Sequence, residues 1–353
     1  MTTNWKVDTT KPVLVTGATG YVAGVLIKEL LSLGVAVHAA VRDPSNTSRF
    51  QELLDLAAKS PGTIKFFKGD LLVEGSYEDG MKGCGIVFHT ASPFALSVKD
   101  PLNDLLIPAV HGTRNVLNSA TKTPSVTRVI CTSSVAAVCT DASDTYKAPG
   151  SVLTEEVWNF TASLDYQPYS YSKTMAELAA WQIAGSQRQW TLVTINPAFV
   201  MGPGVKYHES SESFQMIKRL GCGEMKSGAP NFAVGIVDVR DVARAHIVAA
   251  YNESAKGRYI LCGHCTGFMG MAKILRQKYP LYPFPTSAVP KMLLWLVSPF
   301  VGTGMSRKSI WNNVDVEINF DNSKSQKDLG IQYTPLETTL EEMFQQIIDS
   351  GLT

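Results

Sequence analysis

The sequence predicts an α/β protein with a doubly wound parallel sheet and a smaller, discontinuous C-terminal lobe. Three observations support this fold class. Short apolar runs alternate with amphipathic stretches from Lys11 onward, which is the pattern of βαβ units. A glycine-rich turn follows the first run, where a strand must pass into a helix. The 353 residues are 45% hydrophobic and 18% charged, so the chain can bury a large core.

Six strands are expected where apolar runs are bounded by turn residues. They are 12–16, 35–41, 64–68, 86–89, 128–132 and 191–196. After the first strand, apolar side chains recur every three or four residues until Gly34, which predicts a helix. A second helix, rich in Ala, Glu and Leu, is expected over 169–183 and leads into the sixth strand.

The character of the sequence changes after Pro197. Gly, Ser, Pro and aromatic residues dominate to about Phe232, and strand-to-helix patterning then resumes. We therefore expect a first domain over 1–197 that is completed by about 235–262. Residues 198–234 and 263–353 would form the smaller lobe.

Charge and hydropathy argue against several partners and locations. The chain has 32 Lys and Arg against 31 Asp and Glu, a net charge of +1, so neither nucleic acid nor an anionic membrane is indicated. The first residues are polar and lack the apolar core of a secretory signal, which favours a cytoplasmic protein. The most apolar window, 292–297, is too short to cross a bilayer and is expected to form a buried helix or a cap over a pocket.

The six cysteines are few and irregularly spaced, as expected of reduced thiols in a cytosolic protein. Cys262 and Cys265 have the spacing of a redox-active dithiol. Their context argues against that role, because such a pair should open a helix within a small thioredoxin-like unit, whereas Gly267 and Gly270 follow here. The sequence leaves open whether the pair is redox-active.

The turn after the first strand has the features of a dinucleotide-binding loop. Gly17 and Gly20 lack Cβ atoms, so the backbone can approach a pyrophosphate at the positive end of the helix that follows. The spacing is G-x-x-G-x-x-A, with Ala23 where a third glycine often stands. Glycines also end strands for conformational reasons alone, but the strand, turn and helix context favours a nucleotide cofactor.

The residue after the second strand predicts which nicotinamide cofactor is bound. An acid there would accept hydrogen bonds from a ribose 2′-OH, but this chain has Arg42, whose guanidinium suits a 2′-phosphate. NADP(H) is therefore favoured. Arg49 is either a second cation for that phosphate or a solvated helix residue. Asp43 leaves the alternative of a 2′-OH contact open.

Three side chains form a candidate set for proton transfer. Tyr169 and Lys173 are four residues apart on one face of the predicted helix, and a nearby ammonium should lower the pKa of the phenol. Tyr171 does not have a lysine at this spacing. Ser134, at the end of the fifth strand, would hydrogen-bond the substrate oxygen, whereas Ser133 and Thr132 would cap that strand and border the cofactor. A serine-hydrolase elbow, G-x-S-x-G, is absent.

These residues resemble the extended short-chain dehydrogenase/reductases. The resemblance is to the branch of dihydroflavonol reductases, cinnamoyl-CoA reductases and fungal or bacterial aldehyde and ketone reductases. It covers nearly the whole chain and rests on VTGATGYVA at 15–23, VRDP at 41–44, KGDL at 68–71, VFHTASP at 87–93, TSS at 132–134, YSYSK at 169–173, INP at 195–197, VDVRDV at 237–242 and FDNSKS at 320–325.

The resemblance implies a Rossmann domain that binds NADP(H), a substrate lobe and specific roles for residues. Ser134, Tyr169 and Lys173 would be catalytic. The cofactor would be bound by Gly17, Thr19, Gly20, Tyr21, Val22, Arg42, Arg49, Asp70, Leu71, Thr90, Ala91, Ser92, Thr132, Tyr169, Lys173, Pro197 and Phe199. The substrate would contact Ser134, Cys139, Tyr169 and Ser170. His89 invites a general-base role, but a packed histidine at the end of a strand is the simpler interpretation.

Two departures from the plant enzymes bear on the substrate. Plant dihydroflavonol reductases carry a substrate-contacting Asn where this chain has Cys139, and the N-W-Y-C-Y signature of cinnamoyl-CoA reductases is replaced by LDYQPY at 164–169. Neither plant activity is therefore expected. The stretch 285–307 is longer than in those enzymes and would either reshape the pocket or pack as a helix on the lobe.

We therefore expect an NADPH-dependent reductase of an aldehyde or ketone of modest size, acting as a monomer or homodimer. No metal is expected, because the six histidines show no ligand spacing. One alternative is an NAD(P)-dependent dehydrogenase or epimerase of a nucleotide sugar or a sterol-like alcohol. The other is a non-catalytic NADPH-binding sensor, which would have no need of Ser134, Tyr169 and Lys173 together.

Overall fold

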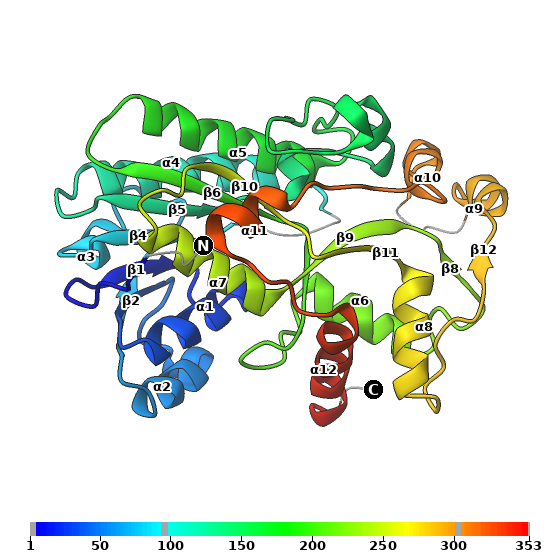
Figure 1. Ribbon diagram of the computed structural model, residues 1–353, viewed down its shortest axis with the longest axis horizontal. Helices are drawn as coiled ribbons and strands as arrows, with labels where there is room; N and C mark the ends of the chain where they lie inside the picture. The colour runs from blue at the N-terminus through cyan, green and yellow to red at the C-terminus, as the bar shows by residue number, and fades with distance from the viewer. Residues whose placement is uncertain (1–4, 93–97, 301–304, 352–353) are drawn as a thin grey trace.

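The computed structural model describes residues 5–92, 98–300 and 305–351 and is built on a seven-stranded parallel sheet (Figure 1). Its strand order is β10-β6-β5-β4-β1-β2-β3. The strands are β1 Val13–Thr16, β2 Ala36–Val41, β3 Thr63–Lys68, β4 Ile86–His89, β5 Arg128–Thr132, β6 Thr191–Pro197 and β10 Gly257–Leu261. The predicted fold class is confirmed, and the six expected strands match β1 to β6 within one residue at each end.

The seventh strand corrects the expected count of six. Strand-to-helix patterning is expected to resume at about residue 235, and the structure has β9 Ala233–Asp238 and α7 Val239–Tyr251 there, followed by β10. β10 pairs with β6 and extends the main sheet, whereas β9 joins a second sheet. A local apolar pattern does not say which partner a strand will pair with, so the sequence could not separate the two.

Helices cover both faces of the main sheet, which explains why the central strands β1 and β4 are apolar on both faces, whereas the edge strand β3 is partly exposed. Val13 and Val15 of β1 pack with α1 and α7 in one core, whereas Leu14 packs with α4 and α5 in another. Figure 1 shows α4 and α5 on one side of the sheet and α1, α2 and α7 on the other. The helices of this part are α1 Tyr21–Ser32, α2 Gln51–Ala58, α3 Glu78–Met81, α4 Ile107–Thr121, α5 Pro168–Gly185 and α11 Ser323–Leu329.

A second, smaller core lies beside the main sheet. A three-stranded sheet in the order β11-β9-β7 packs with α6, α8 and α12 through Phe214, Met271 and Phe344. The division of the chain into two domains at 197 stays a prediction. The elements of this part are β7 Phe199–Met201, α6 Glu212–Gly221, β8 Ala229–Pro230, β11 His264–Gly267, α8 Phe268–Lys278, β12 Ala288–Val289, α9 Lys291–Val297, α10 Arg307–Asn313 and α12 Leu336–Asp349.

Short helical turns complete the described chain. They are η1 Thr47–Phe50, η2 Leu102–Leu106, η3 Val135–Ala137, η4 Ala142–Lys147 and η5 Pro149–Ser151. Pro93, which ends one of the motifs above, and residues 301–304 of the stretch 285–307 lie outside the described residues.

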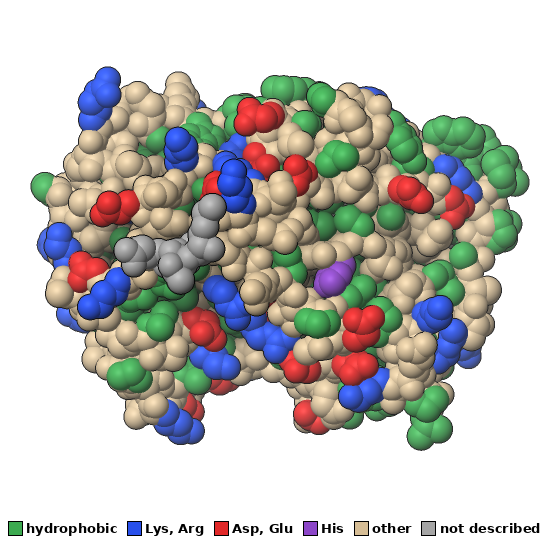
Figure 2. All heavy atoms as spheres, viewed as in Figure 1, with side chains coloured by type: hydrophobic (Ala, Val, Ile, Leu, Met, Phe, Trp, Pro, Cys, Tyr) green, Lys and Arg blue, Asp and Glu red, His purple; other side chains and the backbone are tan. Residues whose placement is uncertain are grey.

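The apolar window 292–297 is a helix, as expected, but it is not buried. In α9 only Leu294 is buried, whereas Met292, Leu293 and Leu296 are 57%, 50% and 53% exposed. Figure 2 shows hydrophobic side chains gathered at the end of the molecule where α9 and α10 lie. No helix of the described chain has the length and apolarity needed to cross a membrane.

Candidate active site

The strand order reverses between β1 and β4, and loops from the carboxyl ends of both strands meet there. In open α/β sheets this is where a ligand binds. Gly17 follows β1 with φ +64°, and a Cβ at this position would lie 2.9 Å from the Cα of Ala91, just beyond β4. The turn can therefore lie this close to the Ala91 backbone only because residue 17 is glycine.

A threonine that sequence reasoning missed ties the two loops together. The Thr16 hydroxyl accepts hydrogen bonds from the backbone N–H groups of Thr90, at 3.1 Å, and Ala91, at 3.0 Å. It also lies 3.0 Å from Nδ1 of His89, whose Nε2 is 3.3 Å from the Thr113 hydroxyl. Burial lowers the pKa of His89 to about 3. His89 is thus buried between two hydroxyl groups, and its lowered pKa makes it a weak base.

The positive end of α1 is open to an anion. Gly20 is the N-cap residue and makes no side-chain cap, and α1 has no acidic residue in its first turn. Arg42 and Arg49 are exposed, and neither forms an ion pair within the described residues. Asp43 Oδ1 accepts hydrogen bonds from the Ser45 hydroxyl, at 2.6 Å, and from its backbone N–H, at 3.0 Å. This carboxylate oxygen already has two local donors, which favours Arg42 as the residue that contacts the 2′-substituent of the cofactor ribose.

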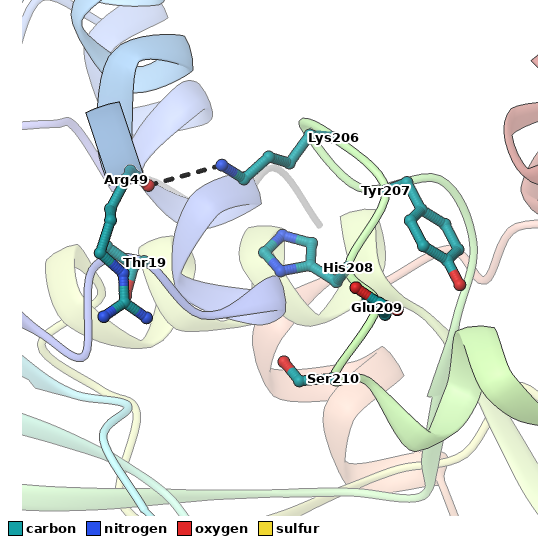
Figure 3. A pocket seen from close by; sticks show the side chains of 7 residues that line it. All are labelled: Thr19, Arg49, Lys206, Tyr207, His208, Glu209 and Ser210. Atoms are coloured by element: carbon teal, nitrogen blue, oxygen red, sulfur yellow. Dashed lines mark hydrogen bonds between the residues drawn. The ribbon is translucent and has the colours of Figure 1, made fainter. Parts of the chain in front are cut away.

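A cavity of about 520 Å³ lies over this turn. It is lined by Thr19, Arg49, Lys206, Tyr207, His208, Glu209 and Ser210. Figure 3 shows Arg49 and Thr19 on one side and the loop 206–210 on the other. The Lys206 ammonium pairs with Glu52 of α2 at 2.9 Å and reaches the Arg49 carbonyl at 3.4 Å, so it holds the loop against the nucleotide-binding part.

The residues present fit a phosphate-rich dinucleotide. The Nε2 atom of His208 is buried and has no hydrogen-bond partner within the described chain, which leaves it available to a ligand. A Cβ at Gly24 would lie 2.9 Å from Val205, so a small residue is needed for the loop to approach α1. Sequence reasoning missed Lys206 and His208, because they come from a loop about 180 residues beyond the turn that they cover.

The three predicted catalytic residues come together at the ends of β5 and α5. Ser134 is the N-cap of η3, directly after β5, and its hydroxyl is hydrogen-bonded to that of Tyr169. Lys173, one helical turn further on, has its ammonium 5.7 Å from the centre of the Tyr169 ring. Lys173 is only 7% exposed. A carbonyl oxygen placed at these hydroxyls would meet two hydrogen-bond donors.

Burial controls the acidity of this group. It raises the pKa of Tyr169 above its ordinary value, while the hydrogen bond from Ser134 opposes the change. The direction is opposite to the expected lowering by Lys173, because desolvation is the largest effect on this phenol. Burial also lowers the pKa of Lys173 from 10.5 to about 8.

A buried network that sequence reasoning missed supports the site. Glu177 is 1% exposed and lies one turn beyond Lys173. Its carboxylate accepts hydrogen bonds from Ser133 at 2.6 Å, Asn196 at 2.8 Å and Thr194 at 3.0 Å, and pairs with Arg258 at 2.8 Å. Glu177 is four residues from Lys173 in the sequence, but its partners lie on β6, on β10 and just after β5.

The other predicted site residues lie at the same edge of the sheet. Two of them, Thr132 and Cys139, direct their side chains into other contacts. Asp70, Leu71, Ser92, Pro197 and Phe199 follow or end β3, β4 and β6 or begin β7, and Ser170 follows Tyr169 on α5. The Thr132 hydroxyl is instead bonded to His246 of α7 at 2.7 Å. Cys139 is 6% exposed and belongs to the main core. Tyr21 and Val22 form the first turn of α1, with the Tyr21 hydroxyl donating to the Gly202 carbonyl.

Comparisons with known proteins agree with the fold. The model of the 3-beta hydroxysteroid dehydrogenase/isomerase family matches residues 14–263. A cinnamoyl-CoA reductase of Medicago truncatula is 36% identical over 339 residues, which cover 95% of each chain. A (2S)-flavan-3-ol-forming anthocyanidin reductase of Vitis vinifera is 39% identical over 287 residues, 78% of this chain and 83% of the other. The structure of Gre2 from Candida albicans in complex with NADPH aligns with a TM-score of 0.77 at 29% identity, over 96% of this chain and 99% of that one.

Proposed function

This chain belongs to the 3-beta hydroxysteroid dehydrogenase/isomerase family of extended short-chain dehydrogenases/reductases, and on that basis we propose that it is an NADPH-dependent reductase of aldehydes or ketones. The resemblance drawn from its motifs is confirmed, and the chain is an oxidoreductase. The finer assignment, to a carbonyl reductase with a substrate of modest size, rests on the residues around Tyr169.

The contact between Tyr169 and Ser134 carries the proposal. Two hydroxyl groups from different elements are hydrogen-bonded beside a buried ammonium, and this arrangement serves a developing oxyanion. When bound, NADPH supplies the hydride that adds to the carbonyl carbon. Ser134 holds the carbonyl oxygen, and Tyr169 donates its hydroxyl proton to that oxygen. A phenol with a raised pKa stays protonated at neutral pH, as a proton donor must.

Lys173 completes the step. Donation of the proton leaves a phenolate on Tyr169, and the nearby ammonium stabilises that charge. The same ammonium would bind the nicotinamide ribose. Arg42 and Arg49 would hold the 2′-phosphate that distinguishes NADPH from NADH, and the turn at Gly17 and Gly20 would hold the pyrophosphate.

An assay of the absorbance of reduced nicotinamide tests the proposal. Purified protein is given NADPH and NADH in parallel, with small aldehydes, α-diketones, aryl ketones and a dihydroflavonol. We expect oxidation of NADPH with several small carbonyls and little with NADH. If NADPH binds without turnover of any of these carbonyls, the proposal fails in favour of a specialised substrate or the non-catalytic sensor. If turnover occurs only in reverse, with NAD⁺ and a sterol-like alcohol or a nucleotide sugar, the chain is a dehydrogenase or epimerase instead.

A further inference from the structure

Two cysteine thiols meet where the main sheet passes into the smaller one. Cys262 follows β10, and Cys265 lies on β11, with only Gly263 and His264 between them. Their Sγ atoms are 3.6 Å apart. This is the only hydrogen bond between two thiols among the described cysteines. The pair does not open a helix, as a thioredoxin-like dithiol would, so its chemistry must be judged from its own surroundings.

The two thiols differ in their access to solvent. Cys262 is 3% exposed, and a Cβ at Gly235 would lie 2.8 Å from its Sγ, so this sulfur is packed against the backbone. Cys265 is exposed. A solution oxidant therefore reaches Cys265 first, and Cys262 is held at its side in position to react next.

The contact also makes the two sulfurs chemically different. The hydrogen bond between the two thiols lowers the pKa of Cys265 and raises that of Cys262, whose Sγ also lies 3.4 Å from the His264 carbonyl. The thiolate is the form that attacks an oxidant, so the exposed cysteine is the more reactive one. By contrast, burial raises the pKa of Cys84 and of Cys131 to about 12.

We propose that Cys265 and Cys262 form a reversible disulfide under attack by hydrogen peroxide. The Cys265 thiolate attacks one peroxide oxygen, the O–O bond breaks, and the leaving hydroxide takes up the proton that the Cys265 thiol had released, so a sulfenic acid and one water form. The Cys262 sulfur then attacks the Cys265 sulfur, the S–S bond forms, the S–O bond breaks, and the leaving hydroxyl takes up the Cys262 thiol proton and departs as a second water. Two thiols and one peroxide thus give one disulfide and two waters, with the sulfurs oxidised and the peroxide oxygens reduced.

The geometry allows this bond to close with a small movement. Closing the gap from 3.6 Å to the disulfide length of about 2.0 Å requires the sulfurs to approach by about 1.6 Å. Cys262 is fixed, because β10 is tied to α5 by the buried Arg258 and Glu177 pair. Cys265 lies on β11, which within the described residues is an edge strand paired with β9 alone, so this side of the pair can move. The closed disulfide would add a second covalent link, beside the backbone, between the end of β10 and β11.

Intact mass and peptide mapping of the reduced full chain after peroxide treatment test the proposal without any need for turnover. We expect the peptide that holds both cysteines to lose two hydrogen atoms and to regain them with dithiothreitol. Cys222, the other exposed cysteine, is the matched control, because it has no thiol neighbour within hydrogen-bond distance. The pair should be half-oxidised by about tenfold less peroxide than Cys222.

Two variants assign the order of steps. In Cys262→Ser, the resolving thiol is absent, so Cys265 should accumulate sulfenic acid that a dimedone probe traps. In Cys265→Ser, Cys262 should stay reduced at the same peroxide dose, because it is buried. Oxidation of Cys265 in the wild type to sulfinic acid without a disulfide would overturn the proposal, as would oxidation of Cys222 at an equal or lower dose. Mapping of the wild-type chain decides the matter even if a variant folds poorly.

Discussion

The Ser133 hydroxyl donates a hydrogen bond of 2.6 Å to Oε2 of Glu177, and both residues are buried. Ser133 precedes Ser134 at the end of β5, and Glu177 lies one turn beyond Lys173 on α5. The bond therefore joins the strand that carries the substrate-binding hydroxyl to the helix that carries Tyr169. Asn196 extends this link, because its amide donates both to Glu177 and to the Ser134 carbonyl.

Glu177→Gln should strongly destabilise the fold. The substitution leaves the buried Arg258 guanidinium without its carboxylate, and removal of one partner from a buried ion pair costs about 3–5 kcal/mol. Denaturant unfolding measures the loss. Glu78→Gln is the control, because its pair with Lys122 is solvent-exposed and should matter little. An equal, small loss in both variants would contradict a structural role for the Glu177 network.

Local patterns predicted most of the main sheet but not how its edge is built. β1 to β6 were found because each is an apolar run with a turn at its end, and the strands of a buried parallel sheet carry this signal on both faces. β9 and β10 carry the same signal, yet they join different sheets. Their partners are set by contacts with β7 and β6, which are distant in sequence.

The predicted catalytic trio meets in space because two of its members share a helix face and the third ends a neighbouring strand. The sequence did not predict Glu177, Lys206 and His208 as site residues, because their contacts are with elements distant in sequence. Glu177 pairs with Arg258, and Lys206 pairs with Glu52. The direction of the Tyr169 pKa was also missed. It depends on burial, which the spacing of Tyr169 and Lys173 does not report.

Tyr169→Phe should abolish most of the reductase activity while leaving NADPH bound. The variant loses only the hydroxyl that gives its proton to the carbonyl oxygen, and general acid catalysis contributes about 10²- to 10⁴-fold to such a step. Steady-state kinetics give the loss in kcat, and quenching of protein fluorescence gives the affinity for NADPH. Tyr171→Phe, two residues away on the same helix, is the control and should keep its activity. Full activity in Tyr169→Phe would remove Tyr169 as the donor.

Lys173 should make the free energy of unfolding depend on pH between about 8 and 10.5. Its pKa is about 8 in the folded chain and 10.5 in its ordinary state, so between these values the unfolded chain binds more protons. The free energy of unfolding of the wild type should therefore rise with pH across this window, relative to that of a variant without this amine. The rise is up to about 1.4 kcal/mol per pH unit. Denaturant unfolding of wild type and Lys173→Met at several pH values measures the difference. A difference that stays constant from pH 8 to pH 10.5 would show that Lys173 titrates normally.

Arg42→Ala should weaken the preference for NADPH over NADH. The guanidinium is proposed to pair with the 2′-phosphate, which NADH lacks, so the KM for NADPH should rise about tenfold or more, or about 1.4 kcal/mol, while that for NADH stays unchanged. Lys28→Ala removes an exposed cation from α1, outside the proposed phosphate site, and controls for the general loss of charge. An equal rise in the KM for NADPH and for NADH in Arg42→Ala would mean that Arg42 does not contact the 2′-phosphate.

Gly17→Ala and Gly34→Ala separate the conformational role of a glycine from its role at the cofactor. Both residues have positive φ, +64° and +80°, so alanine should cost each about 1–2 kcal/mol of stability. A Cβ at Gly34 meets nothing within 4 Å, whereas one at Gly17 would lie 2.9 Å from the Cα of Ala91. Only Gly17→Ala must therefore push the turn away from the end of β4, and only this variant should lose affinity for NADPH. Equilibrium unfolding and NADPH fluorescence titration give both quantities for each variant. Wild-type NADPH affinity in Gly17→Ala would show that the close approach of this turn to Ala91 is not what shapes the pyrophosphate site.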